Sequence, residues 1–135
     1  PANWDTDQDG MPDWWEKLAG TNPSAADNNE LTDGEYTQLE RYLNWLAEPH
    51  FITSAGNKLT IDLKQYFAGY NQQPVFTLES SIQPQEGKMK LNKKGILTIS
   101  LNKKAADCLI DIKVKATDKD QVASLQRTFH IAITQ

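Results

Sequence analysis

The hydrophobic residues of this chain follow a helical period up to about residue 50 and a strand period after it. In the first part, apolar residues recur every three or four positions, at Tyr36, Leu39, Leu43 and Leu46. This spacing predicts one apolar face of a helix that ends at about Ala47, before Pro49. A shorter helix is predicted from Pro12 to about Ala19. Proline fits the first turn of a helix and glycine, here Gly20, commonly follows the last.

After residue 50, apolar residues alternate with polar ones in several short segments. The clearest are 59–63, 97–101, 108–116 and 129–133, and shorter ones are expected at 51–53 and 75–79. Alternation predicts antiparallel strands with one buried face, joined by hairpin turns at 93–95 and 118–120. Two such sheets facing each other form a sandwich. We therefore predict an α+β multidomain fold, with a small helical module at 1–50 and an antiparallel β-sandwich at 51–135.

The charge divides at the same place. Residues 1–50 carry eleven acidic and two basic side chains, a net charge of −9, whereas residues 51–135 carry seven acidic and twelve basic ones, a net charge of +5. The lysines of the second part are spread singly along strand-like segments. That pattern is typical of a solvated sheet face rather than of a nucleic-acid patch, so no nucleic-acid partner is expected.

The acidic part contains a loop with the spacing of a calcium site. Asp5, Asp7 and Asp9 occupy loop positions 1, 3 and 5, and Glu16 occupies position 12. Ca²⁺ takes about six to eight oxygen ligands, and a glycine at position 6, here Gly10, permits the sharp bend. An acidic turn before a helix would explain one or two of these carboxylates. It would not explain three at alternate positions, which repel one another without a cation. The full predicted ligand set is Asp5, Asp7, Asp9, Met11 through its peptide oxygen, Asp13 and Glu16.

A second loop with a weaker match follows. With Gly34 at position 6, Leu31 falls at position 3, where it offers no side-chain oxygen. A reshaped loop would draw on Asp27, Asn29, Asp33 and Glu40. An ordinary turn before a capped helix explains the same residues, and both interpretations stay open. Paired EF-hand loops use a backbone N–H at position 8, which Pro12 lacks. A static, structural ion is therefore expected rather than a sensor.

These residues together resemble a known segment. They are similar to the C-terminal calcium-binding tail of secreted bacterial pectate lyases and related polysaccharide-degrading enzymes. The matching residues are the run Asp5-x-Asp7-x-Asp9-Gly10-Met11-Pro12-Asp13-x-Trp15-Glu16, followed by Gly20-Thr21-Asn22-Pro23 and Gly34-x-Tyr36-Thr37-x-Leu39-Glu40. Its first half also resembles thrombospondin type 3 repeats and dockerins. The resemblance implies Ca²⁺ ligation by Asp5, Asp7, Asp9 and Glu16. The catalytic β-helix of that family lies upstream, and no such repeat is in this chain, so its lyase activity does not carry over.

The second part resembles bacterial cadherin-like and Ig-like sandwich modules. The cues are Leu59-Thr60-Ile61-Asp62-Leu63, Gly95-x-Leu97-Thr98-Ile99, Ile112-x-Val114-x-Ala116-Thr117-Asp118 and Phe129-x-Ile131-x-Ile133. Such modules usually act as spacers or adhesion units. A single cysteine, Cys108, excludes an internal disulfide and a cysteine-based zinc cluster, and no Ser/His/Asp or Cys/His grouping is legible.

We expect a non-catalytic calcium-binding accessory or spacer region of a secreted or cell-surface bacterial protein. Its expected partner is an upstream enzyme domain of the same chain, together with a polysaccharide or a cell-surface protein. A carbohydrate- or protein-binding module, dockerin-like or adhesion-like, is the alternative, with no binding residues assigned. Membrane insertion is not expected, because no apolar run approaches the roughly 20 residues of a membrane span.

Overall fold

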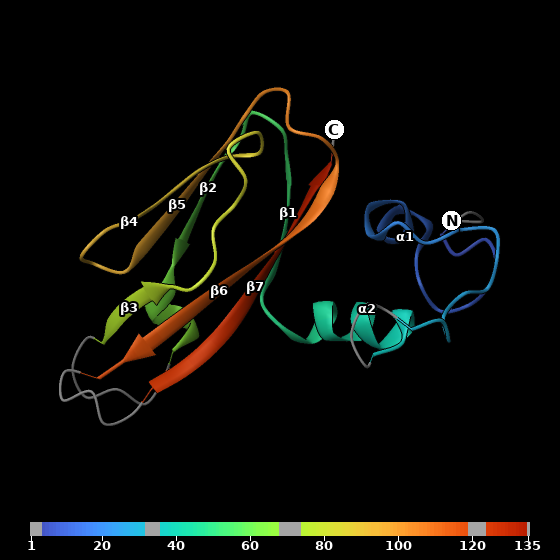
Figure 1. The fold of residues 1–135 in the computed structure, drawn as a ribbon, viewed down its shortest axis with the longest axis horizontal. Helices are drawn as coiled ribbons and strands as arrows, with labels where there is room; N and C mark the ends of the chain where they lie inside the picture. The colour runs from blue at the N-terminus through green and yellow to red at the C-terminus, as the bar shows by residue number, and fades with distance from the viewer. Residues whose placement is uncertain (1–3, 32–35, 68–73, 119–123, 135) are drawn as a thin grey trace. The chain divides into compact units, whose positions relative to one another are not determined.

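The computed structural model describes residues 4–31, 36–67, 74–118 and 124–134. The chain divides into two compact units, Pro1–Glu48 and Pro49–Gln135, which are coloured blue to cyan and cyan to red in Figure 1. Each unit is described by itself. In the described ranges, no helix is both long and apolar enough to cross a membrane.

The first unit contains two short helices, α1 (Asp13–Ala19) and α2 (Gln38–Ala47). Helix α1 begins after Pro12 and ends at Gly20, whose N–H donates to the Glu16 carbonyl. Helix α2 begins at Thr37 with a capping box. The Glu40 N–H donates to Thr37 Oγ1 at 3.1 Å, and the Thr37 N–H donates to Glu40 Oε1 at 3.2 Å. Both predicted helices are therefore present.

The buried face of α2 differs from the predicted apolar stripe. Tyr42 and Trp45 are only 6% and 4% exposed, whereas Leu43 and Leu46 are 50% and 44% exposed. The reason lies in α1, because Trp15 packs edge-on against Tyr42 at a ring separation of 5.1 Å, and Trp14 against Trp45 at 5.7 Å. Aromatic pairs bury more area than leucine pairs and so set the rotation of α2.

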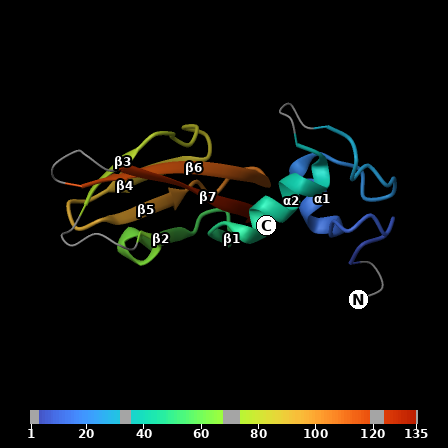
Figure 2. The ribbon, with the colours of Figure 1, turned by 90° about the horizontal axis from the view of Figure 1, so that it is seen from below.

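The second unit consists of two packed sheets (Figures 1 and 2). One has the strand order β1-β7-β6-β3 and the other β2-β5-β4. The strands are β1 (His50–Ser54), β2 (Lys58–Asp62), β3 (Val75–Leu78), β4 (Gly87–Leu91), β5 (Ile96–Leu101), β6 (Cys108–Thr117) and β7 (Ser124–Thr134), with a 3-10 turn at Leu63–Tyr66. Inward-facing residues of both sheets form one core, in which Leu97, Ile99, Ile112, Phe129 and Ile131 are fully buried. The architecture is a β-sandwich, whose two sheets resemble those of Ig-like domains.

Two features of the sandwich depart from the sequence predictions. Strand β1 pairs with β7 in parallel, from His50↔His130 to Ser54↔Thr134, although only antiparallel strands were expected. Alternation along a strand does not specify the direction of its neighbour. Strand β4 was not predicted at all. It begins at Gly87, where a Cβ would lie 2.2 Å from the Ser100 carbonyl oxygen, so only glycine allows this close approach to β5.

The two predicted hairpin turns have different outcomes. Residues 93–95 form the turn between β4 and β5, where the Gly95 N–H donates to the Asn92 carbonyl at 3.2 Å. Residues 119 and 120 of the other predicted turn lie outside the described residues.

Candidate metal centre

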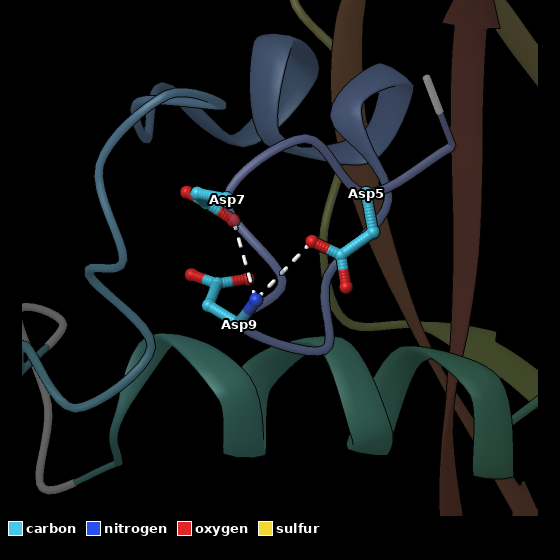
Figure 3. Close-up of side chains that lie close together, drawn as sticks. All are labelled: Asp5, Asp7 and Asp9. Carbon is cyan, nitrogen blue, oxygen red and sulfur yellow. Dashed lines mark hydrogen bonds between the residues drawn. The ribbon is translucent and has the colours of Figure 1, made fainter. Parts of the chain in front are cut away.

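The loop before α1 is folded by hydrogen bonds from its backbone to its own carboxylates. The Gly10 N–H donates to Asp5 Oδ2 at 2.9 Å, and Gly10 adopts a φ of +97°, which favours glycine. The Asp9 N–H donates to Asp5 Oδ1 at 3.2 Å and to Asp7 Oδ1 at 3.3 Å, as Figure 3 shows. The Met11 N–H donates to Asp9 Oδ1 at 3.0 Å. These bonds gather the three aspartates around the inside of the bend.

Two overlapping triplets of carboxylates result. One ligand oxygen from each of Asp5, Asp7 and Asp9 lies within 4.8 Å of the other two, and the same holds for Asp9, Glu16 and Asp27. Asp9 belongs to both triplets, so the five side chains form one continuous cluster. Glu16 comes from the middle of α1, and Asp27 comes from the loop that follows it.

The Asp9, Glu16 and Asp27 part of the cluster is buried, and several oxygens of the cluster lack a hydrogen-bond donor. Glu16 is fully buried, and Asp9 and Asp27 are 8% and 9% exposed. Among the described residues, no hydrogen-bond partner reaches the buried atoms Asp7 Oδ2, Asp9 Oδ2, Glu16 Oε2 or Asp27 Oδ1. An unpartnered buried oxygen is costly, and a buried carboxylate is costlier unless a cation balances it. The four oxygens are the ligand type that hard divalent cations take.

The electrostatics of the metal-free cluster lead to the same conclusion. The pKa of Glu16 is raised from 4.5 to about 7, mainly by burial and then by the neighbouring charges of Asp7, Asp9 and Asp27. The pKa of Asp7 is also raised, first by desolvation and then by Asp9. Crowded carboxylates thus resist ionisation in the absence of a compensating cation.

The turn after α1 fixes the far side of the cluster. Thr21 Oγ1 donates to Glu16 Oε1 at 3.2 Å, and the Asn22 N–H donates to Asp27 Oδ2 at 2.9 Å. Each carboxylate therefore has one oxygen held by the turn and the other without a partner. In metal-binding carboxylates, one oxygen is typically oriented by a hydrogen bond from the protein while the other binds the metal.

The structure places the predicted first-loop residues as follows. Asp5, Asp7, Asp9 and Glu16 lie in the cluster. Asp13 belongs to neither triplet. Its two oxygens accept from the Thr6 N–H at 2.8 Å and from Thr6 Oγ1 at 2.6 Å. These two bonds lower the pKa of Asp13. Met11 is fully buried, and ligation by its carbonyl stays a prediction.

The predicted second-loop residues are not gathered into a second cluster in the described part of the chain. Asp27 lies with Asp9 and Glu16 instead. Asn29 and Glu40 are exposed, and the Glu40 carboxylate belongs to the helix cap. Asp33 lies outside the described residues. Asp27 was assigned to the second loop because the twelve-residue template ends at Glu16. The only sequence signal for its actual place is the turn Gly20-Thr21-Asn22-Pro23, which reverses the chain after α1.

Comparisons with known proteins report similarity only in solved structures. No family model matches the chain, and no curated protein matches its sequence. The titin M3 domain superposes with a TM-score of 0.41 at 12% identity, over 64% of this chain and 90% of that one. InlP of Listeria monocytogenes gives 0.36 at 14% identity, and a nucleoside hydrolase-related hypothetical protein of Saccharophagus degradans gives 0.37 at 10%. The chain spans 26% and 22% of the length of these two proteins.

Proposed function

We propose that the first unit binds one structural Ca²⁺ ion in the cluster formed by Asp5, Asp7, Asp9, Glu16 and Asp27. The observation that supports this most strongly is the set of four buried carboxylate oxygens without a hydrogen-bond partner among the described residues. The carboxylate oxygens lie in two triplets that share Asp9, and closely grouped carboxylate oxygens suit a hard cation. Magnesium usually keeps several waters and takes one or two carboxylates, so five carboxylates favour calcium. The Met11 carbonyl is the expected additional ligand.

The ion would act as a cross-link within the unit. Asp5 and Asp27 lie at the two ends of a segment that includes all of α1, so a common ion holds that segment closed. A unit of 48 residues buries too little apolar surface to be very stable alone, and metals commonly compensate in units of this size. At a free Ca²⁺ concentration about 100 times the Kd, binding stabilises the folded state by roughly 2.7 kcal/mol.

We further propose that the whole chain is a non-catalytic accessory or spacer region of a secreted or cell-surface bacterial protein. The resemblance of residues 3–46 to the tails of polysaccharide-degrading enzymes supports an upstream enzyme domain. An Ig-like sandwich that follows a metal-stabilised unit in the sequence suits a spacer, because neither needs to move for its role.

Calcium titration of the full chain tests the proposal. Tb³⁺, a Ca²⁺ substitute excited through nearby tryptophan, is expected to luminesce when bound, because Trp15 follows the loop on α1. Ca²⁺ is expected to displace it, and EDTA is expected to lower the melting temperature of the first unit. Asp9→Asn is expected to weaken binding by at least about tenfold, since affinity follows the ligand charge. Glu30→Gln, an exposed acid of the same unit, is the matched control. A melting curve unchanged by EDTA and Ca²⁺ would contradict the proposal.

A further inference from the structure

The outward face of the sheet β2-β5-β4 has a net positive charge, with three lysines against one aspartate at the outward strand positions. Side chains that point away from the core include Lys58 on β2 and Lys88 and Lys90 on β4, and all three are exposed. Their strand neighbours on the opposite face, such as Leu59 and Met89, pack against the core instead. We call the outward-facing residues of these three strands the lysine face.

The register of the strands gives this face a defined shape. Lys58, Ser100 and Lys88 are aligned across the sheet in one row, and Thr60, Thr98 and Lys90 in the next row on that face. The central strand therefore carries short hydroxyl side chains, and the long lysines stand on the strands that flank it. Two strand spacings separate Lys58 from Lys88, or about 10 Å at the backbone. Hydroxyl side chains on the central strand therefore lie between Lys58 on one side and Lys88 and Lys90 on the other.

Neighbouring acidic groups do not neutralise this charge. Among the described residues, no acidic side chain lies within ion-pair distance of Lys58, Lys88 or Lys90. Asp62, in the row with Ile96, is the one acidic residue at an outward position of the three strands. Further exposed lysines extend the basic surface into the turn after β5, at Lys103 and Lys104.

From this arrangement we propose that the lysine face binds a linear acidic polysaccharide, one whose sugars carry carboxylate or sulfate groups. Charge complementarity supplies the attraction, and the lysines act as point charges that do not demand one anion geometry. Ser100, Thr98 and Thr60 offer hydroxyl donors and acceptors to sugar hydroxyls. Single-stranded nucleic acid suits the face less well, because the outward positions of these strands include no aromatic side chain on which a base could stack. This inference does not depend on calcium binding.

Two triple variants of the full chain test the proposal in the presence of Ca²⁺. Lys58→Gln/Lys88→Gln/Lys90→Gln removes three charges from the lysine face. Lys113→Gln/Lys115→Gln/Arg127→Gln removes three from the other sheet and is the matched control. Binding is measured by calorimetry with hyaluronate and dextran sulfate, with uncharged dextran as the reference polymer. Thermal melting verifies that both variants fold.

The lysine-face variant is expected to bind both acidic polymers about 10- to 100-fold more weakly than the unmodified chain, with a smaller salt dependence. The control variant is expected to lose much less affinity, and dextran should not bind. Equal losses in the two variants would overturn the proposal, because they would report net charge alone. Binding to oligothymidylate but to neither acidic polysaccharide would overturn it. The proposal would also be overturned if sedimentation showed that self-association is the only interaction that the lysine-face substitutions remove.

Discussion

Asp27 lies outside the twelve-residue loop and yet contributes a carboxylate to the same cluster as Asp9 and Glu16. Its Oδ2 is held by the Asn22 N–H, which leaves Oδ1 buried and directed to the cluster. If the proposed ion is bound, Asp27 would link its separate loop to the metal. The carboxylate cluster therefore depends on the fold of the whole unit and not on the loop alone.

Asp27→Asn is expected to weaken Ca²⁺ binding by roughly 10- to 100-fold, because the centre loses one of its charged ligands. Terbium luminescence and calorimetry on the full chain would measure the loss. Glu30→Gln makes the same change of charge at an exposed position nearby and should bind normally. Unchanged affinity in Asp27→Asn would place Asp27 outside the metal centre.

Glu16 gives the metal-free protein a characteristic pH dependence. Its pKa is about 7 in the folded, metal-free state against an ordinary value of 4.5, so between these values the folded state holds a proton that the unfolded chain has lost. The stability of the metal-free protein should therefore fall as the pH rises from about 4.5 to 7. Ca²⁺ requires the ionised carboxylate, so the stabilisation by Ca²⁺ should grow over the same range.

Melting temperatures at several pH values, in EDTA and in excess Ca²⁺, would measure both trends. Glu16→Gln cannot titrate and should lack the part of the EDTA trend that Glu16 causes. A variant whose pH dependence in EDTA matches that of the unmodified chain would show that Glu16 is not the responsible group.

At the scale of the elements, the start of α2 depends on one threonine. Thr37 Oγ1 accepts a hydrogen bond from the Glu40 N–H, and the Glu40 carboxylate accepts one from the Thr37 N–H. Thr37→Ala is expected to lower the free energy of unfolding of the first unit by about 1 kcal/mol. Urea unfolding followed by circular dichroism would measure it. Thr37→Ser keeps the acceptor and should stay close to the unmodified chain, and equal losses in both variants would argue against the cap.

The elements that the sequence predicted correctly are those with a long local pattern. Strand β6 alternates over ten residues, and helix α1 is bounded by Pro12 and Gly20. Strand β4 is short, and its lysines and glycine are typical of a loop. Only the structure shows that Gly87 lies against Ser100 of the neighbouring strand. Hydrophobic periodicity does not predict which face of α2 is buried, because its leucines and its aromatic residues define two different apolar faces. Contacts with the tryptophans of α1 determine that the aromatic face is the buried one.

The candidate site was predictable to the same extent. Asp5, Asp7, Asp9 and Glu16 follow a local template, and all four lie in the cluster. Asp13 fits the template equally well, but Thr6 supplies two donors that hold it elsewhere. Asp27 joins through a chain reversal that no spacing rule describes. Local spacing therefore identifies the carboxylates of one loop that lie together, whereas tertiary contacts bring in Asp27; their ligation of a metal stays a prediction.

At the scale of the whole molecule, the opposite charges of the two parts acquire separate roles. Five acidic residues of the first unit form one partly buried cluster, whereas the lysines of β2 and β4 spread over an exposed sheet face. A net charge of −4 for the whole chain conceals this contrast. Calcium and an acidic polymer would therefore act on different units of one chain, and each can be removed without the other.

The parallel pairing of β1 with β7 also determines how the sandwich responds to tension. Its five aligned residue pairs lie between the start of β1 and the end of β7, so a pull on these two ends loads all the pairs in shear at once. A pull applied at Ser54→Cys and Thr134→Cys, which face each other at one end of the β1–β7 pairing, would instead peel these pairs apart one after another. Atomic force microscopy should find a several-fold higher rupture force in the first geometry, and equal forces would show that β1 is not a mechanical clamp.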